Sequence, residues 1–219
     1  MNIKRERRFE NTSTSQTFQH IVTAFDLDKK SVLDIGCSLG QFLIHFGKHS
    51  AGISISKDEV EYGKQKGLDI RYGNIESDDF VWEEKFDVIF CNNLFEHLYS
   101  PHHFLFKVRT YLKPNGILIL GVPCIPKIVW LLRVRKFRGS LAVAHINFFT
   151  RDTLIKTVER GGWKVMCARG FHFKSRILDA VCRPLYPHFY VAAAPIPDFH
   201  YSGKRMQELV GYADNRPTA

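Results

Sequence analysis

Short apolar runs alternate with longer stretches of mixed polarity along most of the chain. Five runs rich in β-branched and other apolar residues are separated by stretches long enough for a helix: 31–35, 51–55, 68–72, 86–91 and 117–122. This alternation is typical of parallel strands covered by helices on both faces. Two closing strands are expected at 163–168 and 188–194, and if they pair as a hairpin one must run antiparallel to the rest. The pattern predicts a doubly wound α/β fold with a mostly parallel seven-stranded sheet and one antiparallel strand.

Local signals mark where several of the helices begin. Ser56-Lys57-Asp58-Glu59 is a capping box, and Ser100-Pro101 places a cap residue before a proline in the first turn. Helices are therefore expected to begin near Lys57 and Pro101, and a last covering helix is expected over 151–161. The proline, asparagine and glycine of 113–116 predict a turn that ends the second of these helices and begins the strand at 117.

Length and composition predict one domain. The chain has 219 residues, of which 45% are hydrophobic, enough to bury one sizeable core. We expect a single domain over 1–219, with an N-terminal helical segment at 1–30 and a polar tail at 199–219. No apolar run approaches the ~20 residues that cross a bilayer, and the charged N-terminus predicts no secretory signal. The five cysteines form no CxxC pair and predict reduced thiols, so a cytoplasmic location is expected.

The charge balance is strongly basic. The formal net charge is +9 and the isoelectric point is near 9.4. An acidic partner such as nucleic acid, phospholipid or a phosphorylated substrate would suit this charge. Many enzymes are simply basic, however, and charge alone does not choose among these interpretations.

The segment 32–40 is the most informative motif. A strand that ends in Asp34 and runs into a small-residue turn brings helix-start amides to the carboxyl edge of the sheet, where nucleotide-like ligands bind. Gly36 and Gly40 would let the backbone approach such a ligand closely. A dinucleotide site would show GxGxxG facing a pyrophosphate. Here an acid precedes the glycines and Ser38 replaces the middle glycine, which suits a ligand with an ammonium group.

Three further motifs follow in order. They are Glu96-His97, the turn at 112–116, and the run Ala-His-Ile-Asn-Phe-Phe-Thr at 144–150 with Gly-Gly-Trp at 161–163. Together with the first turn, they resemble class I S-adenosylmethionine-dependent methyltransferases of the small-molecule type over roughly residues 30 to 170. The resemblance implies a Rossmann-like fold, S-adenosyl-L-methionine as cofactor, and methyl transfer to an oxygen or nitrogen of a sugar, quinone or lipid-linked acceptor.

The resemblance also implies a set of cofactor contacts. The first turn would lie under the methionine part, with Asp34 ordering the turn or reaching the amino group through water. The family usually places a carboxylate at the end of the second strand to bind the ribose hydroxyls, where this chain has Ser54. A hydroxyl forms weaker hydrogen bonds, by on the order of 1 kcal/mol each, unless a neighbour compensates. Asn74 stands where relatives recognise the adenine amino group, and Asn92 where they contact the methionine end. The implied contacts are Asp34, Gly36, Cys37, Gly40, Ser54, Ile55, Asn74, Ile75 and Asn92.

Two histidines are candidates for catalysis. Methyl transfer needs alignment in a dry pocket, and a general base only when the acceptor is a hydroxyl. His97 and His145 could each supply that base, or could instead hold a loop or cap the helix after Thr150. In similar quinone-ring O-methyltransferases an acid three residues before the Glu-His pair helps to hold a divalent ion. That position is Asn93 here, so no metal is expected.

Two segments, 125–147 and 174–187, are predicted to cover the acceptor, because insertions at the first place form a lid in related enzymes. Residues 127–138 carry five basic side chains among tryptophan, leucine and phenylalanine. This mixture suits an acidic or amphipathic acceptor, or peripheral contact with a membrane, and it is equally typical of a solvated helix with an apolar face.

Two other functions stay open at this stage. A nucleic-acid methyltransferase would fit the charge, but the residues after the fourth strand are Cys-Asn-Asn-Leu at 91–94, not an Asn/Asp-Pro-Pro-Tyr-type base-flipping motif. A protein that binds the cofactor without catalysing transfer is the other alternative.

Overall fold

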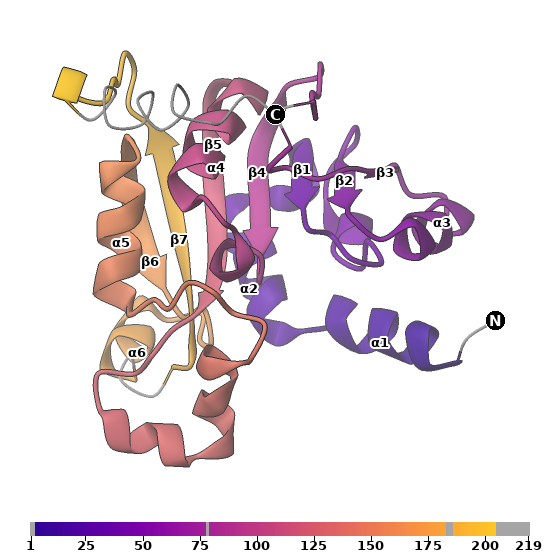
Figure 1. Cartoon of the computed structure of the whole chain (residues 1–219). Coiled ribbons are helices and arrows are strands. Elements are labelled where there is room, and N and C mark those ends of the chain that lie inside the picture. The colour runs from indigo at the N-terminus through magenta and orange to yellow at the C-terminus, as the bar shows by residue number, and fades with distance from the viewer. Residues whose placement is uncertain (1–2, 78, 183–185, 205–219) are drawn as a thin grey trace, which may run out of the picture.

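The computed structural model describes residues 3–77, 79–182 and 186–204 (Figure 1). The strands of this part form one sheet in the order β3-β2-β1-β4-β5-β7-β6. Their bounds are β1 (Val32–Ile35), β2 (Ala51–Ser54), β3 (Ile70–Tyr72), β4 (Phe86–Asn92), β5 (Leu112–Pro123), β6 (Trp163–Arg169) and β7 (His188–Pro195). Only β7 is antiparallel to its neighbours β5 and β6, whereas the other pairs are parallel. The predicted fold class is confirmed.

Helices flank both faces of the sheet (Figure 1). They are α1 (Ile3–Ser13), α2 (Gln16–Phe25), α3 (Lys57–Gln65), α4 (Pro101–Val108), α5 (Arg151–Arg160) and α6 (Arg176–Val181). Turns of 3-10 helix are η1 (Leu27–Lys29), η2 (Leu43–His45), η3 (Phe95–His97), η4 (Arg109–Tyr111), η5 (Val129–Arg133) and η6 (Arg135–Leu141). The predicted starts of α3 and α4 are confirmed, because the hydroxyls of Ser56 and Ser100 accept hydrogen bonds from the third backbone amide of each helix.

The core consists of two layers, one on each face of the sheet. In β4, Val88 and Phe90 belong to the apolar cluster that includes α2 residues such as Phe18. Ile89 and Cys91 point the other way, into the cluster that contains side chains of α4 and α5. Successive residues of a strand point to opposite faces. A strand buried on both faces therefore needs the continuous apolar run that the sequence shows here.

The segment 113–116 differs from its predicted role. It does not precede β5 but lies inside it, since Leu112 already pairs with Phe86 and Ile117 pairs with Val88. The residues between them stand opposite Asp87 alone, and Asn115 has a φ of +63°. The turn-forming residues of this segment therefore form a bulge within a long strand.

The remaining predictions concern the two ends of the chain, membrane spans and the cysteines. The helices α1 and α2 occupy most of the N-terminal segment 1–30. Of the predicted tail 199–219, residues 205–219 lie outside the described residues, as do 183–185 of the segment 174–187. In the described part of the chain, every helix is too short or too polar to span a membrane. All five cysteines are free thiols.

Candidate functional site

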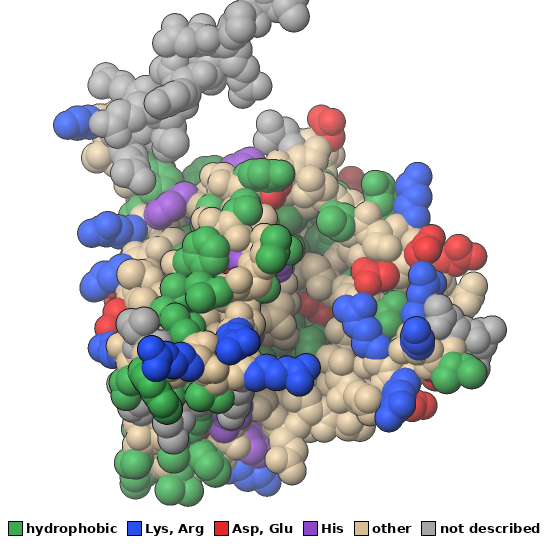
Figure 2. Space-filling model, turned by 60° about the horizontal axis from the view of Figure 1, so that its bottom comes forward, with side chains coloured by type: hydrophobic (Ala, Val, Ile, Leu, Met, Phe, Trp, Pro, Cys, Tyr) green, Lys and Arg blue, Asp and Glu red, His purple; other side chains and the backbone are tan. Residues whose placement is uncertain are grey.

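A cavity of about 400 Å³ opens at the carboxyl edge of β1, β2 and β4. Figure 2 looks onto this edge, where the surface is hollowed near the middle of the molecule. The volume falls in the range of small-molecule sites, ~300–1,000 Å³. The lining residues are Arg8, Ile35, Gly36, Ser38, Ile53, Ser54, Ile55, Glu59, Gly73, Asn74, Ile75, Glu76, Leu94, His97, Leu98 and Tyr99.

The glycine turn forms the floor of this cavity. The backbone amides of Gly36 and Cys37 both donate to the carbonyl of Ile53, which ties the turn to β2. Gly36 has a φ of +78°, and a Cβ there would lie 3.2 Å from the Leu94 side chain across the cavity. Gly40 has the same φ, but a Cβ there would lie 2.5 Å from Ile70, in the core. Gly36 therefore allows the turn to approach Leu94 closely within the cavity lining, whereas Gly40 allows close packing against the core.

Asp34 lies buried directly before this turn. One oxygen of its carboxyl group, Oδ2, has no hydrogen-bond partner among the described residues. Burial raises the pKa of Asp34 to about 8. An unpaired carboxyl group in an apolar environment is costly, and a cation nearby would favour its charged form. This position therefore fits a ligand with an ammonium group above the turn.

One side of the cavity is formed by the residues that follow β2 and β3. Ile55 is largely exposed at its rim, and Ile75 is buried beside Asn74. The Asn74 side-chain oxygen, predicted to accept a hydrogen bond from adenine, already accepts one from the backbone amide of Glu76 at 3.0 Å. A carbonyl oxygen has two lone pairs, so one acceptor site remains for a ligand.

Glu96, in η3, carries the most unusual side chain of the site. It is only 1% exposed, and neither of its carboxylate oxygens has a hydrogen-bond partner in the described structure. Burial raises the pKa of Glu96 to about 7, with His97 acting in the opposite direction. Its Oε1 lies 3.9 Å from Nε2 of His97 and 3.9 Å from Nε2 of His145. The structure thus brings both predicted histidines to one buried carboxyl group.

Backbone carbonyls orient the two imidazole rings. Nδ1 of His97 lies 2.9 Å from the carbonyl oxygen of Ala144, and Nδ1 of His145 lies 3.4 Å from that of Ser140. Carbonyl oxygens only accept hydrogen bonds, which assigns the ring proton of each histidine to Nδ1. In both rings Nε2 is then the nitrogen that faces Glu96.

The loop after β4 is joined to the segment before α5, about 50 residues further along. The backbone amides of Ile146 and Asn147 donate to the carbonyl of Glu96 at 3.1 and 2.9 Å. The side-chain amide of Asn147 donates to the carbonyl of Leu98 at 2.6 Å. These bonds hold His145 beside Glu96.

The same three side chains could hold a cation. The ligand atoms of Glu96, His97 and His145 all lie within 4.8 Å of one another, and such a donor set suits several divalent metals. Asn93, on which the prediction of no metal rests, instead accepts a hydrogen bond from Nε2 of His188 at 2.8 Å. Burial lowers the pKa of His188 to about 3, so its ring is neutral. That the site works without a metal stays a prediction.

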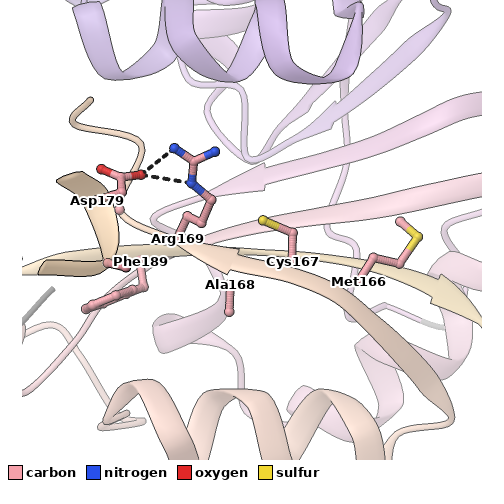
Figure 3. A pocket seen from close by; sticks show the side chains of 8 residues that line it. Met166, Cys167, Ala168, Arg169, Asp179 and Phe189 are labelled. Carbon is pink, nitrogen blue, oxygen red and sulfur yellow. Dashed lines mark hydrogen bonds and ion pairs between the residues drawn. The ribbon is translucent and has the colours of Figure 1, made fainter. Parts of the chain in front are cut away.

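A second cavity, of about 200 Å³, lies beside β6 and contains none of the predicted site residues (Figure 3). Figure 3 shows Arg169 turned toward Asp179, and their side chains form a buried ion pair of 2.8 Å. Asp179 also accepts hydrogen bonds from the backbone amides of Phe171 and Phe173 and from the hydroxyl of Tyr186. This cluster fastens the segment after β6 to the sheet and leaves Asp179 no free role in chemistry.

The predicted site residues fall into two groups. Those that line the main cavity are Gly36, Ser54, Ile55, Asn74, Ile75 and His97. Those outside its lining are Asp34, Cys37, Gly40, Asn92 and His145. Sequence reasoning did not single out Arg8 or Glu59, which line the cavity, or Glu96 as a separate group. The sequence around Glu59 predicts only a helix cap, and nothing in the sequence marks Arg8.

The comparison with known proteins settles the family. Residues 6–168 match the methyltransferase domain family. The chain belongs to the class I S-adenosylmethionine-dependent methyltransferases. The predictions of S-adenosyl-L-methionine as cofactor and of methyl transfer to a small molecule are confirmed for this methyltransferase.

Curated relatives of the methyltransferase include enzymes named for ubiquinone biosynthesis. The ubiquinone biosynthesis O-methyltransferase of Histophilus somni is 30% identical over 166 residues, which are 67% of this chain and 70% of the relative. The mitochondrial enzyme of the same name from Schizosaccharomyces pombe is 25% identical over 142 residues, 59% of this chain and 51% of the relative. Against other such relatives the methyltransferase spans about half of their length or less.

Solved structures agree with the fold. An S-adenosylmethionine-dependent methyltransferase from Thermotoga maritima superposes with a TM-score of 0.61 at 17% identity, over 87% of this chain and 94% of that one. Another from Mesorhizobium loti has a TM-score of 0.61 at 14% identity, over 82% and 98%. At these identities the likeness supports the fold alone.

Proposed function

We propose that this methyltransferase methylates a hydroxyl group of a small acceptor, bound between η3 and the segment 125–147. The buried Glu96 carboxyl group carries the proposal, because neither of its oxygens has a hydrogen-bond partner among the described residues and Oε1 faces the Nε2 atoms of His97 and His145. Of the two histidines, His97 lines the cavity that also contains Gly36. A base is thus held beside the place where the cofactor is expected.

In the proposed reaction the cofactor supplies the methyl group, and the protein binds the cofactor and accepts a proton. Bound S-adenosyl-L-methionine supplies the methyl group from its sulfonium centre. The residues at the ends of β1, β2 and β3 would hold it, with Gly36 and Asn74 as contacts and Ser54 beside them. Nε2 of His97 accepts the proton that the acceptor's hydroxyl loses as the new carbon–oxygen bond forms. In its ionised form Glu96, whose Oε1 lies 3.9 Å from Nε2 of His97, would stabilise the resulting imidazolium.

The relatives support a quinone precursor as acceptor class. They are named for an O-methylation in ubiquinone biosynthesis, and a phenolic ring attached to an apolar chain would suit the surroundings of the cavity. The segments 125–147 and 174–187 are proposed to cover such an acceptor.

Methyl transfer to a panel of phenols, with and without an apolar tail, tests the proposal. Release of adenosylhomocysteine is the readout. We expect His97→Gln to lower kcat by about 10²–10⁴-fold with unchanged affinity for adenosylhomocysteine. The exposed His103→Gln of α4 is the control. Loss of activity with EDTA, restored by a divalent cation, would instead assign Glu96, His97 and His145 to a metal. Cofactor binding without turnover on any acceptor, or turnover on RNA or DNA, would contradict the proposal.

We further propose that the acceptor is presented by an anionic membrane surface. The segments around η5, η6 and α6 expose large apolar side chains, among them Trp130 at 62% and Val181 at 72%. They lie at the same end of the molecule (Figure 1), and Figure 2 shows apolar and basic side chains intermixed on this side. Among the side chains that the structure describes in these segments, the exposed basic ones are Lys127, Arg133, Arg135, Arg138 and Lys174.

The charge of this surface favours anionic lipid. The sequence has no Asp or Glu between residues 125 and 150, and Asp179 of α6 is buried. Basic residues near a membrane gain about 1 kcal/mol each from anionic lipids, while exposed apolar side chains enter the interface.

Sedimentation with vesicles tests the membrane contact. We expect binding to phosphatidylglycerol vesicles that weakens with added salt, and little binding to phosphatidylcholine vesicles. The triple change of Arg133, Arg135 and Arg138 to Glu should abolish binding. The same change at the exposed Lys48, Lys64 and Arg160 should retain most of it. Equal binding of both triple variants would contradict the assignment of this surface.

A further inference from the structure

The cavity holds a carboxylate where the ribose of the cofactor is expected, and it comes from an unexpected element. The resemblance implies a carboxylate at the end of β2, where Ser54 stands. Glu59, five positions further along in the first turn of α3, reaches the same place. Its Oε2 accepts a hydrogen bond from the Ser54 hydroxyl at 2.9 Å, and its Oε1 accepts one from the Ser38 hydroxyl at 2.8 Å.

The local structure of α3 directs this side chain into the cavity. Ser56 alone caps the helix, since its hydroxyl accepts from the backbone amide of Glu59. The carboxylate of Glu59, which would complete a capping box, extends instead to the glycine turn and the end of β2. The Ser54 hydroxyl accepts from the backbone amide of Ser56 at 3.2 Å, which leaves its proton for Glu59. Glu59 is held at a defined position, with 24% of its side chain exposed.

We propose that Glu59 binds the vicinal hydroxyls of the cofactor's ribose, in place of the strand-end carboxylate. An ionised carboxylate offers about four acceptor sites, and the two serines use one on each oxygen. One site therefore remains on each oxygen, which matches two neighbouring hydroxyl donors. Hydrogen bonds to a charged acceptor are roughly twice as strong as neutral ones. Ser38 and Ser54 act as positioning residues for this carboxylate.

Helix α1 closes the same corner of the cavity. Arg8 donates to the Ser38 hydroxyl at 3.2 Å and lies 3.9 Å from Oε1 of Glu59. The helix is fastened to α3 by a hydrogen bond of 2.6 Å from the Tyr62 hydroxyl to Glu6, and by the rings of Phe9 and Tyr62, whose centroids are 6.0 Å apart. A cationic side chain thus lies beside the carboxylate of Glu59.

The inference rests on the cofactor site of the proposed function, and its test separates the two. Calorimetry compares adenosylhomocysteine with its 2′-deoxy and 3′-deoxy analogues. We expect the wild-type protein to bind adenosylhomocysteine at least tenfold more tightly than either analogue. Glu59→Gln should weaken adenosylhomocysteine binding about tenfold and reduce this preference to threefold or less. Glu61→Gln, an exposed neighbour on α3, is the matched control and should retain the wild-type preference.

The outcomes are distinct. If the wild-type protein binds none of the three ligands, the cofactor site itself is wrong. If Glu59→Gln binds adenosylhomocysteine but keeps the wild-type preference, Glu59 does not bind the ribose.

A second variant guards against a general loss of folding. Ser54→Asp in the Glu59→Gln background restores a carboxylate at the strand end, so we expect it to recover the preference for the intact ribose at least threefold. A folded double variant that discriminates no better than Glu59→Gln would overturn the assignment of this corner to the ribose hydroxyls.

Discussion

At the scale of single residues, three positions carry a neutral group where the family resemblance implies an acid. The structure gives each of them a different neighbour. Ser54 donates to Glu59, Asn74 accepts from the amide of Glu76, and Asn93 accepts from the ring of His188. Two of these neighbours lie within a few positions in sequence, but His188 comes from β7, about 95 residues further along the chain. The effect of each neutral residue therefore depends on the group to which it is hydrogen-bonded.

Substitutions at Gly36 and Gly67 distinguish the effect of backbone strain from the effect of ligand contact. Both have a φ of +78°, but a Cβ at Gly67 would meet nothing within 4 Å. We expect Gly36→Ala and Gly67→Ala each to lower the free energy of unfolding by about 1–2 kcal/mol, because a Cβ is strained at positive φ. Only Gly36→Ala should also weaken adenosylhomocysteine binding, by tenfold or more. Chemical denaturation and calorimetry measure the two effects. Equal affinities in the two variants would show that the turn does not touch the cofactor.

At the scale of elements, the segment between β6 and β7 depends on one side chain. The Asp179 carboxylate of α6 accepts hydrogen bonds from two backbone amides, from the Tyr186 hydroxyl and from the Arg169 guanidinium. Burial alone would raise the pKa of Asp179, but the hydrogen bonds from Phe173, Tyr186 and Arg169 outweigh it and hold the pKa below its usual value. A short helix of this kind has little stability of its own, so this cluster maintains the fold of the segment.

Removing the Asp179 carboxylate tests this role. We expect Asp179→Ala to lower the free energy of unfolding by about 3 kcal/mol, because it leaves Arg169 and buried donors unpaired. The lowered pKa means that the contribution is present above pH ~4 and is lost as the pH falls further. The difference between wild type and variant should therefore shrink below pH ~4. Asp152→Ala, which breaks an exposed pair with Lys127, should cost at most ~1 kcal/mol. A pH-independent difference would contradict this account.

At the scale of the whole molecule, the candidate active site joins segments that are far apart in the chain. The turn η3 supplies Glu96 and His97, and the segment before α5 supplies His145. Asn147 connects the two through its bond to the carbonyl of Leu98. The cavity is lined by residues at the ends of β1, β2 and β3, by α3 and by the loop that contains His97, whereas Glu96, His145 and Asn147 lie outside its lining. Catalysis and cofactor binding should accordingly respond to different substitutions.

Asn147→Ala tests this division. We expect kcat to fall by about 10²-fold, because a small displacement of the catalytic group is enough to cause such a loss. The affinity for adenosylhomocysteine should stay within twofold of wild type. Steady-state kinetics and calorimetry provide the two values, and the exposed Asn11→Ala of α1 is the control. A parallel loss of affinity would show that the two sites are not separate.

The sequence by itself determined the fold class, the family motifs and the cofactor. The reason is that these depend on local signals: apolar runs that only buried parallel strands need, cap residues at helix starts, and glycines in a turn after Asp34. The two histidines were also found in this way, because each belongs to a short motif.

Only the tertiary structure decided which groups meet. Glu59 resembles a cap residue in the sequence, and the folded chain turns its carboxylate to Ser38 and Ser54 instead. Glu96 resembles half of a motif, and only the folded chain buries its carboxyl group beside His145, with no hydrogen bond from any described residue. Such features depend on contacts between distant segments, and one sequence without its fold contains no measure of those distances.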